Sequence, residues 1–160
     1  MQTVGLTALV EKLKLKNLTP EVDMSDTVIT TPNINRPALQ LAGYFDHFAS
    51  DRVQIIGYVE YTYLKHLTIE QRLPIYERFL SSEIPCVIFS SRTEPDDEFL
   101  KLAVKHNKPL LASDQETSPF MAECIRALST MLAPCISIHG VLVDVYGEGV
   151  LIVGESGIGK

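Results

Sequence analysis

The chain has 160 residues and a formal net charge of −6, with 46% hydrophobic and 21% charged residues. This composition is typical of a folded globular protein, and the length suits one ordinary domain or a small domain followed by the start of another. The acidic balance excludes a general nucleic-acid binder, which needs a basic surface to displace counterions from phosphates. No stretch approaches the roughly 20 apolar residues of a membrane span and the N-terminus lacks a signal-peptide pattern, so we expect a cytoplasmic protein without membrane contact.

The first third of the chain is predicted to open with an amphipathic helix over about residues 3–14. Its apolar positions recur at helical spacing: Leu6, Leu9, Val10 and Leu13. Residues 28–30 fit a short strand, and the following TPNINRP is a turn-rich loop. Pro37 suits the start of a helix over PALQLAGY, because proline is favoured in the first helical turn.

Apolar strands alternate with amphipathic helices from residue 53 onward. Thr68 is predicted to open the first of these helices, and Thr93 with Asp96 forms a capping box for the second. The predicted strands cover residues 53–57, 85–89 and 108–113, and the last helix covers about 118–132. This alternation predicts an α/β fold with a mostly parallel sheet.

The pattern changes at Ala133-Pro134. Beyond this point two β-rich runs, CISIHGVLVDVY and GVLIV, flank the turn GEG. We therefore expect a small N-terminal α/β domain over residues 1–133, and the opening β-hairpin of a P-loop domain over residues 134–160.

A glycine-rich segment at the end of this hairpin fits the G-x-x-x-x-G-K portion of a Walker A phosphate-binding loop. Its residues are Gly154, Glu155, Ser156, Gly157, Ile158, Gly159 and Lys160. The glycines let backbone N–H groups turn inward around an anion, and the lysine brings a positive charge to the β and γ phosphates. The alternative is a flexible glycine-rich turn without a ligand. The Ser or Thr that would bind Mg²⁺, and the helix that completes such a site, would follow Lys160.

His139 lies at a break in the alternation of the first β-rich run. Apolar positions are even-numbered before His139-Gly140 and odd-numbered after it, which predicts a β-bulge at Gly140. A histidine re-aimed by a bulge near a P-loop can hydrogen-bond to phosphate or move a proton. The alternative is a structural histidine whose ring nitrogens are hydrogen-bonded within the fold.

The remaining histidines and cysteines show no metal-binding spacing, so we assign no metal ligand within the chain. Cys86, Cys124 and Cys135 each lie in an apolar stretch and are predicted to be reduced core residues. His47, His66 and His106 are predicted to lie on the surface, and the acidic run over residues 94–98 to offset the macrodipole at the start of a helix.

Four segments together resemble the bacterial HPr kinase/phosphorylase family over the whole chain. They are NRPALQLAGYFDHF, RVQIIGYVEYTYL, IPCVIFSSRTEP and SIHGVLVDVYGEGVLIVGESGIGK. Members of this family phosphorylate a seryl residue of the phosphocarrier protein HPr with ATP or pyrophosphate, and reverse the reaction by phosphorolysis. Consistent with this, the chain lacks the Gly-rich loop, VAIK, HRD and DFG motifs of eukaryotic protein kinases.

The resemblance implies an N-terminal α/β domain, a P-loop catalytic domain and a hexamer assembled through the catalytic domains. It places Lys160 on the nucleotide phosphates and gives His139 the position of the family's active-site histidine. It also implies that the general base, the Mg²⁺ ligands and the HPr-docking residues lie beyond Lys160, so this chain alone is expected to be inactive. Two alternatives remain at this stage: an α/β module fused to an unrelated P-loop NTPase, and an independent regulatory or assembly module that binds a partner or metabolite.

Overall fold

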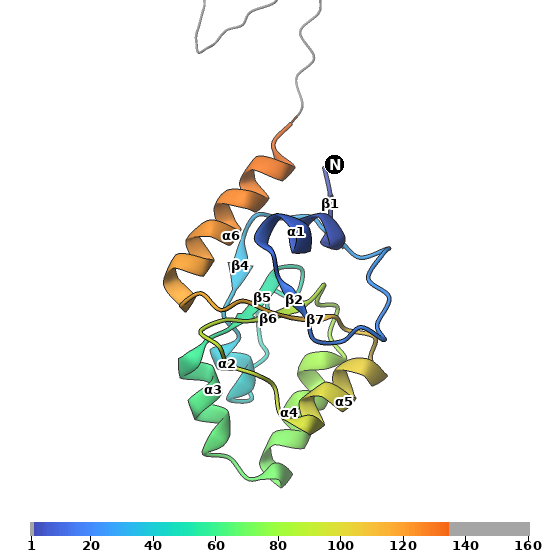
Figure 1. Ribbon diagram of the computed structural model, residues 1–160. Coiled ribbons are helices and arrows are strands. Elements are labelled where there is room, and N and C mark those ends of the chain that lie inside the picture. The colour runs from blue at the N-terminus through green and yellow to red at the C-terminus, as the bar shows by residue number, and fades with distance from the viewer. Residues whose placement is uncertain (1, 135–160) are drawn as a thin grey trace, which may run out of the picture.

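A five-stranded, mostly parallel sheet lies at the centre of the protein (Figure 1). The structure is a computed structural model that describes residues 2–134. Four strands run parallel and a fifth joins one edge antiparallel, in the order β2-β7-β6-β5-β4. They are β2 (Lys16–Asn17), β4 (Ile34–Asn35), β5 (Val53–Ile56), β6 (Val87–Phe89) and β7 (Leu110–Ala112). A separate antiparallel pair joins β1 (Val4–Gly5) to β3 (Val28–Ile29).

Helices cover both faces of the sheet, which gives three layers. One face carries α1 (Leu6–Leu13) and α6 (Thr117–Leu132), drawn above the sheet in Figure 1. The other carries α2 (Ala38–Leu41), α3 (Tyr58–Lys65), α4 (Ile69–Leu80) and α5 (Asp97–Lys105), drawn below it. The helices that follow β4, β5 and β6 lie on one face, and the helix that follows β7 lies on the other.

The central strands send alternate side chains into two hydrophobic cores, as the two-residue period of a strand requires. Ile55, Ile88 and Leu111 pair across β5, β6 and β7 and belong to the core beneath α1 and α6. The neighbouring Ile56 and Phe89 belong to the core beneath α2 to α5. Because both faces are covered, these strands are apolar almost throughout, which is typical of parallel sheets.

The sequence predicted side-chain caps for two helices, α4 and α5, and both helices begin with a side-chain cap. Thr68 caps α4, where its hydroxyl accepts from the Gln71 N–H and the Gln71 side chain accepts from the Thr68 N–H. The predicted box of Thr93 with Asp96 is wrong, because Asp96 itself is the N-cap of α5 and accepts from the Phe99 N–H at 2.8 Å. The Thr93 hydroxyl is buried and donates to the Ser90 carbonyl.

The predicted α/β class with a mostly parallel sheet is confirmed, and the three predicted strands from residue 53 onward contain β5, β6 and β7. The segment TPNINRP is not wholly a loop, because it contains β4 at the edge of the sheet. A helix that was not predicted, α3, follows β5 directly. Its exposed Tyr58 and Val59 break the amphipathic pattern that reveals helices in a sequence.

Several predicted environments can be compared with the structure. Cys86 and Cys124 are free thiols in the core, as predicted, while Cys135 lies outside the described residues. His106 is not simply a surface residue, because its side chain is only 19% exposed and its Nε2 lies 2.8 Å from Glu77 Oε2.

Within residues 2–134 no helix has the length and apolar character needed to cross a bilayer.

Candidate functional site

The site residues predicted from the sequence lie outside the described part of the chain. These are His139 and the glycine-rich segment from Gly154 to Lys160. The domain boundary expected after residue 133 lies at the end of that part and stays a prediction. The described residues have a site of their own, which the sequence did not predict.

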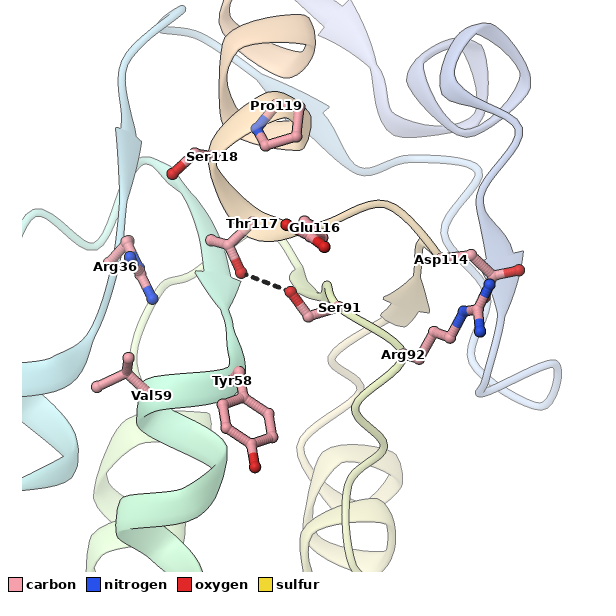
Figure 2. A pocket seen from close by; sticks show the side chains of 10 residues that line it. All are labelled: Arg36, Tyr58, Val59, Ser91, Arg92, Asp114, Glu116, Thr117, Ser118 and Pro119. Atoms are coloured by element: carbon pink, nitrogen blue, oxygen red, sulfur yellow. Dashed lines mark hydrogen bonds between the residues drawn. The ribbon is translucent and has the colours of Figure 1, made fainter.

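This site is a cavity of about 720 Å³ at the carboxyl ends of the parallel strands (Figure 2). In open α/β sheets ligands bind at this edge, where consecutive connections leave for opposite faces. Here the connection after β6 contains α5 and the one after β7 leads to α6 on the other face. The cavity lies between the starts of α3 and α6 and the loop after β6. Its lining residues are Arg36, Tyr58, Val59, Ser91, Arg92, Asp114, Glu116, Thr117, Ser118 and Pro119.

Arg36 is held at the cavity by a buried carboxylate. Its Nη2 lies 2.7 Å from Oε1 of Glu60, whose side chain is only 3% exposed. The same carboxylate oxygen accepts the N–H of Gly57, the residue that precedes α3. The Arg36 side chain is 34% exposed, and its Nε is buried without a hydrogen-bond partner among the described residues. Glu60 therefore orients the guanidinium group, whose Nη1 makes no hydrogen bond among the described residues and is the nitrogen left to donate to a ligand.

Thr117, the first residue of α6, joins the loops after β5 and β6. Its hydroxyl lies 2.8 Å from Ser90 Oγ and 3.0 Å from Ser91 Oγ. A Cβ at Gly57 would overlap the Thr117 hydroxyl and would lie 2.8 Å from Arg36 Nη2. Glycine is therefore required at position 57 by close packing, since its φ of −106° is open to every residue. This packing fixes the start of α6 against the ends of β5 and β6.

The loop after β6 has an unusual backbone conformation. Ser91 and Arg92 are consecutive residues with φ values of 58° and 59°, in the left-handed region that costs non-glycine residues roughly 1–3 kcal/mol each. The Ser91 N–H donates to the Gln115 carbonyl at 2.6 Å, in the loop before α6. The surrounding contacts thus hold a strained segment in place, and this conformation brings Ser91 and Arg92 to the cavity.

Opposite charges lie at the two sides of the cavity. Figure 2 shows Arg92, Asp114 and Glu116 on the opposite side of Thr117 from Arg36. Asp114 and Glu116 together outweigh the charge of Arg92, so their side is acidic. The Arg36 side has the hydroxyl of Ser118 and the N-terminus of α6, whose first turn contains no acidic residue but whose N-cap is Glu116. At this helix N-terminus the N–H groups of Thr117 and Ser118 have no partner within the helix, whereas Pro119 has no N–H and the Phe120 N–H donates to the Glu116 carbonyl. These two N–H groups and the Arg36 guanidinium are the donors that the Arg36 side offers to an anion.

A second polar cluster lies beside a smaller cavity of about 200 Å³ between α3, α4 and α5. Oδ2 of Asp96 accepts from Arg72 Nη1 at 2.8 Å and from the Tyr76 hydroxyl at 2.6 Å. Burial, followed by the hydrogen bond to Asp96, raises the pKa of Tyr76 above its ordinary value, so the phenol stays protonated. This cluster joins α4 to the cap of α5, and we interpret it as structural.

Neither cavity contains an arrangement for covalent catalysis. The hydroxyls of Ser90, Ser91 and Thr117 bond to one another without a base within hydrogen-bond reach among the described contacts. No group of three or more His, Cys, Asp or Glu side chains within residues 2–134 is placed to hold a metal ion. The volume and polar lining of the larger cavity suit the binding of a small ligand.

Sequence signals for this cavity exist but are short. Three of the four parallel strands are followed by a glycine or serine: Gly57 after β5, Ser90 after β6 and Ser113 after β7. In a parallel sheet such residues meet at one edge. Arg36 has no such signal, because it follows the two-residue edge strand β4, which the sequence pattern did not reveal.

Two family models match the chain in succession. The model described as "HPr Serine kinase N terminus" matches residues 4–128, and "HPr Serine kinase C-terminal domain" matches residues 130–160. One solved structure, the CBS and DRTGG domains of the regulatory region of Clostridium perfringens pyrophosphatase, is 15% identical with a TM-score of 0.49, covering 76% of this chain and 45% of that one. A likeness of this size supports no inference about function.

Relatives named HPr kinase/phosphorylase match this chain over its whole length. The protein from Lachnoclostridium phytofermentans is 53% identical over 160 residues, which are 100% of this chain and 52% of the relative. That from Caldicellulosiruptor bescii is 47% identical over 158 residues, 99% of this chain and 50% of the relative. The chain thus spans about half the length of the relatives it matches. Because a family model covers most of the chain and full-chain relatives agree with it, the chain belongs to the HPr kinase/phosphorylase family.

Proposed function

We propose that the protein containing this chain is a bifunctional serine kinase and phosphorylase acting on the phosphocarrier protein HPr in the control of bacterial carbon metabolism. The main support for this proposal is that the models of both HPr kinase domains match this chain, one directly after the other. This succession leaves the alternative of an unrelated P-loop NTPase without support. Because the chain spans about half of its relatives, the activity belongs to the longer protein, and this chain alone is expected to be inactive.

The glycine-rich segment from Gly154 to Lys160 would hold the phosphates of ATP or pyrophosphate. Phosphoryl transfer proceeds through a transition state whose negative charge is spread over the phosphoryl oxygens, so catalysis depends mainly on positioning and charge stabilisation. The loop N–H groups and the Lys160 ammonium would supply both. Mg²⁺ would add further charge, through ligands located beyond Lys160.

His139 would act next to these phosphates. An imidazole has one nitrogen that donates and one that accepts when neutral, so it can hydrogen-bond to a phosphate oxygen or transfer a proton. Residues 1–133 would form the N-terminal domain and residues 134–160 the start of the catalytic domain. The complete enzyme would assemble as a hexamer through its catalytic domains.

Replacement of Lys160 tests the proposed function in the full-length protein. Lys160→Ala is expected to abolish both phosphorylation of HPr with ATP or pyrophosphate and its reversal by inorganic phosphate. Mass spectrometry of HPr measures the phosphoserine formed or removed. Lys101→Ala is the matched control, since that side chain is 75% exposed on α5 and should leave both reactions intact. Retention of either reaction in the Lys160 variant would contradict the assigned role.

Replacement of His139 separates its catalytic from its structural interpretation. His139→Ala is expected to lower turnover by at least about a hundredfold, as for a residue in proton transfer. The unfolding midpoint of the variant should stay close to that of the parent protein. A loss of stability as large as the loss of turnover would favour a structural histidine.

A further inference from the structure

We propose that the cavity between α3, α6 and the loop after β6 binds a small phosphate monoester, with its phosphate between Arg36 and the start of α6. This site lies within the N-terminal domain and is distinct from the nucleotide loop at Gly154 to Lys160. It therefore goes beyond the proposed kinase function.

The Arg36 side of the cavity has the donors that a phosphate needs. Glu60 fixes the guanidinium through Nη2, the Nε is buried out of a ligand's reach, and Nη1 makes no hydrogen bond among the described residues and can donate. Figure 2 shows the Ser118 hydroxyl on the same side of the cavity as Arg36. Ser118 is the second residue of the 16-residue helix α6, and its N–H and that of Thr117 have no partner within the helix. These are the two N–H groups that the helix offers, because Pro119 has none and the Phe120 N–H donates to the Glu116 carbonyl. An arginine, a hydroxyl and helix N–H groups are a common combination for phosphate recognition.

The size and the remaining walls favour an ester over the free ion. A volume of about 720 Å³ falls among the cavities of roughly 300–1,000 Å³ that hold small organic ligands and far exceeds what one phosphate fills. The rings and methyl groups of Tyr58 and Val59, which are 61% and 67% exposed, offer an apolar surface for the organic part. A Tyr face can also pack against a sugar or base.

The opposite side of the cavity favours one phosphate over several. Asp114 and Glu116 line that side together with Arg92, so the local charge there would repel a second phosphate group. Their carboxylates can instead accept hydrogen bonds from ligand hydroxyls or amines. A sugar monophosphate and a nucleoside monophosphate share this chemistry, and the experiment distinguishes them.

Titration calorimetry on the 160-residue chain tests the proposal with AMP, glucose 6-phosphate and inorganic phosphate as probes. At least one ester should bind at least about tenfold more tightly than inorganic phosphate, since only the ester fills the apolar part of the site. Tighter binding of AMP identifies the nucleoside source, and tighter binding of glucose 6-phosphate identifies the sugar source. No binding of either ester at about 10 mM, or equal binding of esters and inorganic phosphate, would overturn the proposal.

Two variants locate the binding. Arg36→Gln should weaken the ester by about 10–100-fold, the effect of losing a charge-assisted hydrogen bond. Because this change also leaves Glu60 without its cation, Ser118→Glu provides a second test. A carboxylate in the first turn suits a helix N-terminus and preserves the fold, while it repels a phosphate. The control is Ser129→Glu, an exposed position on the same helix. Circular dichroism verifies folding of each variant.

Lys160→Ala distinguishes this site from the nucleotide loop. The proposal predicts that this variant binds the ester as the parent chain does. Loss of binding in Lys160→Ala together with retention in Ser118→Glu would show that the ester occupies the loop, and would overturn the site at α6. The kinase assignment would be unaffected by that outcome, because it depends on phosphoserine formation in HPr.

Discussion

The close packing of Gly57 against α6 yields a quantitative prediction about the stability of the carboxyl edge. In Gly57→Ala the new methyl group overlaps the Thr117 hydroxyl and lies 3.0 Å from its Cγ2. Thr117 is β-branched and stiff, so relief requires its rotation or a shift of α6. Overpacking costs about 1–3 kcal/mol, and loss of the Thr117 bonds to Ser90 and Ser91 adds about 1 kcal/mol. We expect a total near 3 kcal/mol.

A double-mutant cycle separates this clash from other effects of the methyl group. Thr117→Ala removes both Oγ1 and Cγ2, so Gly57→Ala should cost only about 1 kcal/mol in that background. The residual cost reflects the poorer helix cap and a displacement of Arg36, whose flexible side chain can move. The coupling energy between positions 57 and 117 is therefore expected to be about 2 kcal/mol.

Urea unfolding followed by circular dichroism measures these differences. A loss of 3 kcal/mol lowers the unfolding midpoint by roughly 1.5 M for a typical urea slope of about 2 kcal/mol per molar. Gly5→Ala is the matched control, because Gly5 also precedes a helix with extended backbone and its Cβ would meet only Thr7 Oγ1 at 3.8 Å. A cost for Gly57→Ala no larger than that for Gly5→Ala would exclude a clash at position 57. Equal costs of Gly57→Ala with and without Thr117, within about 0.5 kcal/mol, would exclude Thr117 as its partner.

Three further predictions concern single side chains. Tyr76→Phe removes the hydroxyl that donates to Asp96 and should lower the free energy of unfolding by about 1 kcal/mol in urea unfolding. The hydrogen bond to His106 lowers the pKa of Glu77 below its usual 4.5, so the stability that this bond contributes is present above pH 4.5 and is lost as the pH falls through the lowered pKa. His106→Ala should therefore reduce the loss of stability with acid, which unfolding midpoints between about pH 5 and pH 3 would measure. Burial raises the pKa of Cys124 to about 12, so its labelling by a thiol reagent at neutral pH should follow unfolding, as peptide mass spectrometry would record.

Each of these predictions has a control and a contrary outcome. Tyr44→Phe, at a side chain that is 50% exposed, should leave stability unchanged. An equal loss of stability in Tyr44→Phe and Tyr76→Phe would show that the loss does not come from the hydrogen bond to Asp96. His66→Ala, at an exposed histidine, should preserve the acid-dependent loss. Complete labelling of Cys124 in the native protein within minutes would show that its burial does not limit access.

The architecture of the central sheet was readable in the sequence because its determinants are local. Apolar strands and amphipathic helices have different periods, so their alternation after residue 53 predicted both the α/β class and the three central strands. The start of α4 at Thr68 was likewise predicted, since a capping box consists of neighbouring residues. Four segments in a fixed order, from NRPALQLAGYFDHF to the glycine-rich segment that ends at Lys160, indicated the family, and each of them is likewise a run of neighbouring residues.

Only the tertiary structure decided where the cavity of the N-terminal domain lies and which groups line it. Arg36 follows an edge strand two residues long, too short to show a period, and it reaches the cavity through its pairing with Glu60 on α3. Gly57 and Thr117 are far apart in the chain and meet because parallel strands end at one edge. The cap of α5 was misassigned to Thr93 because its hydroxyl turns to the Ser90 carbonyl instead. Local patterns determine elements, whereas a binding site depends on which elements pack together.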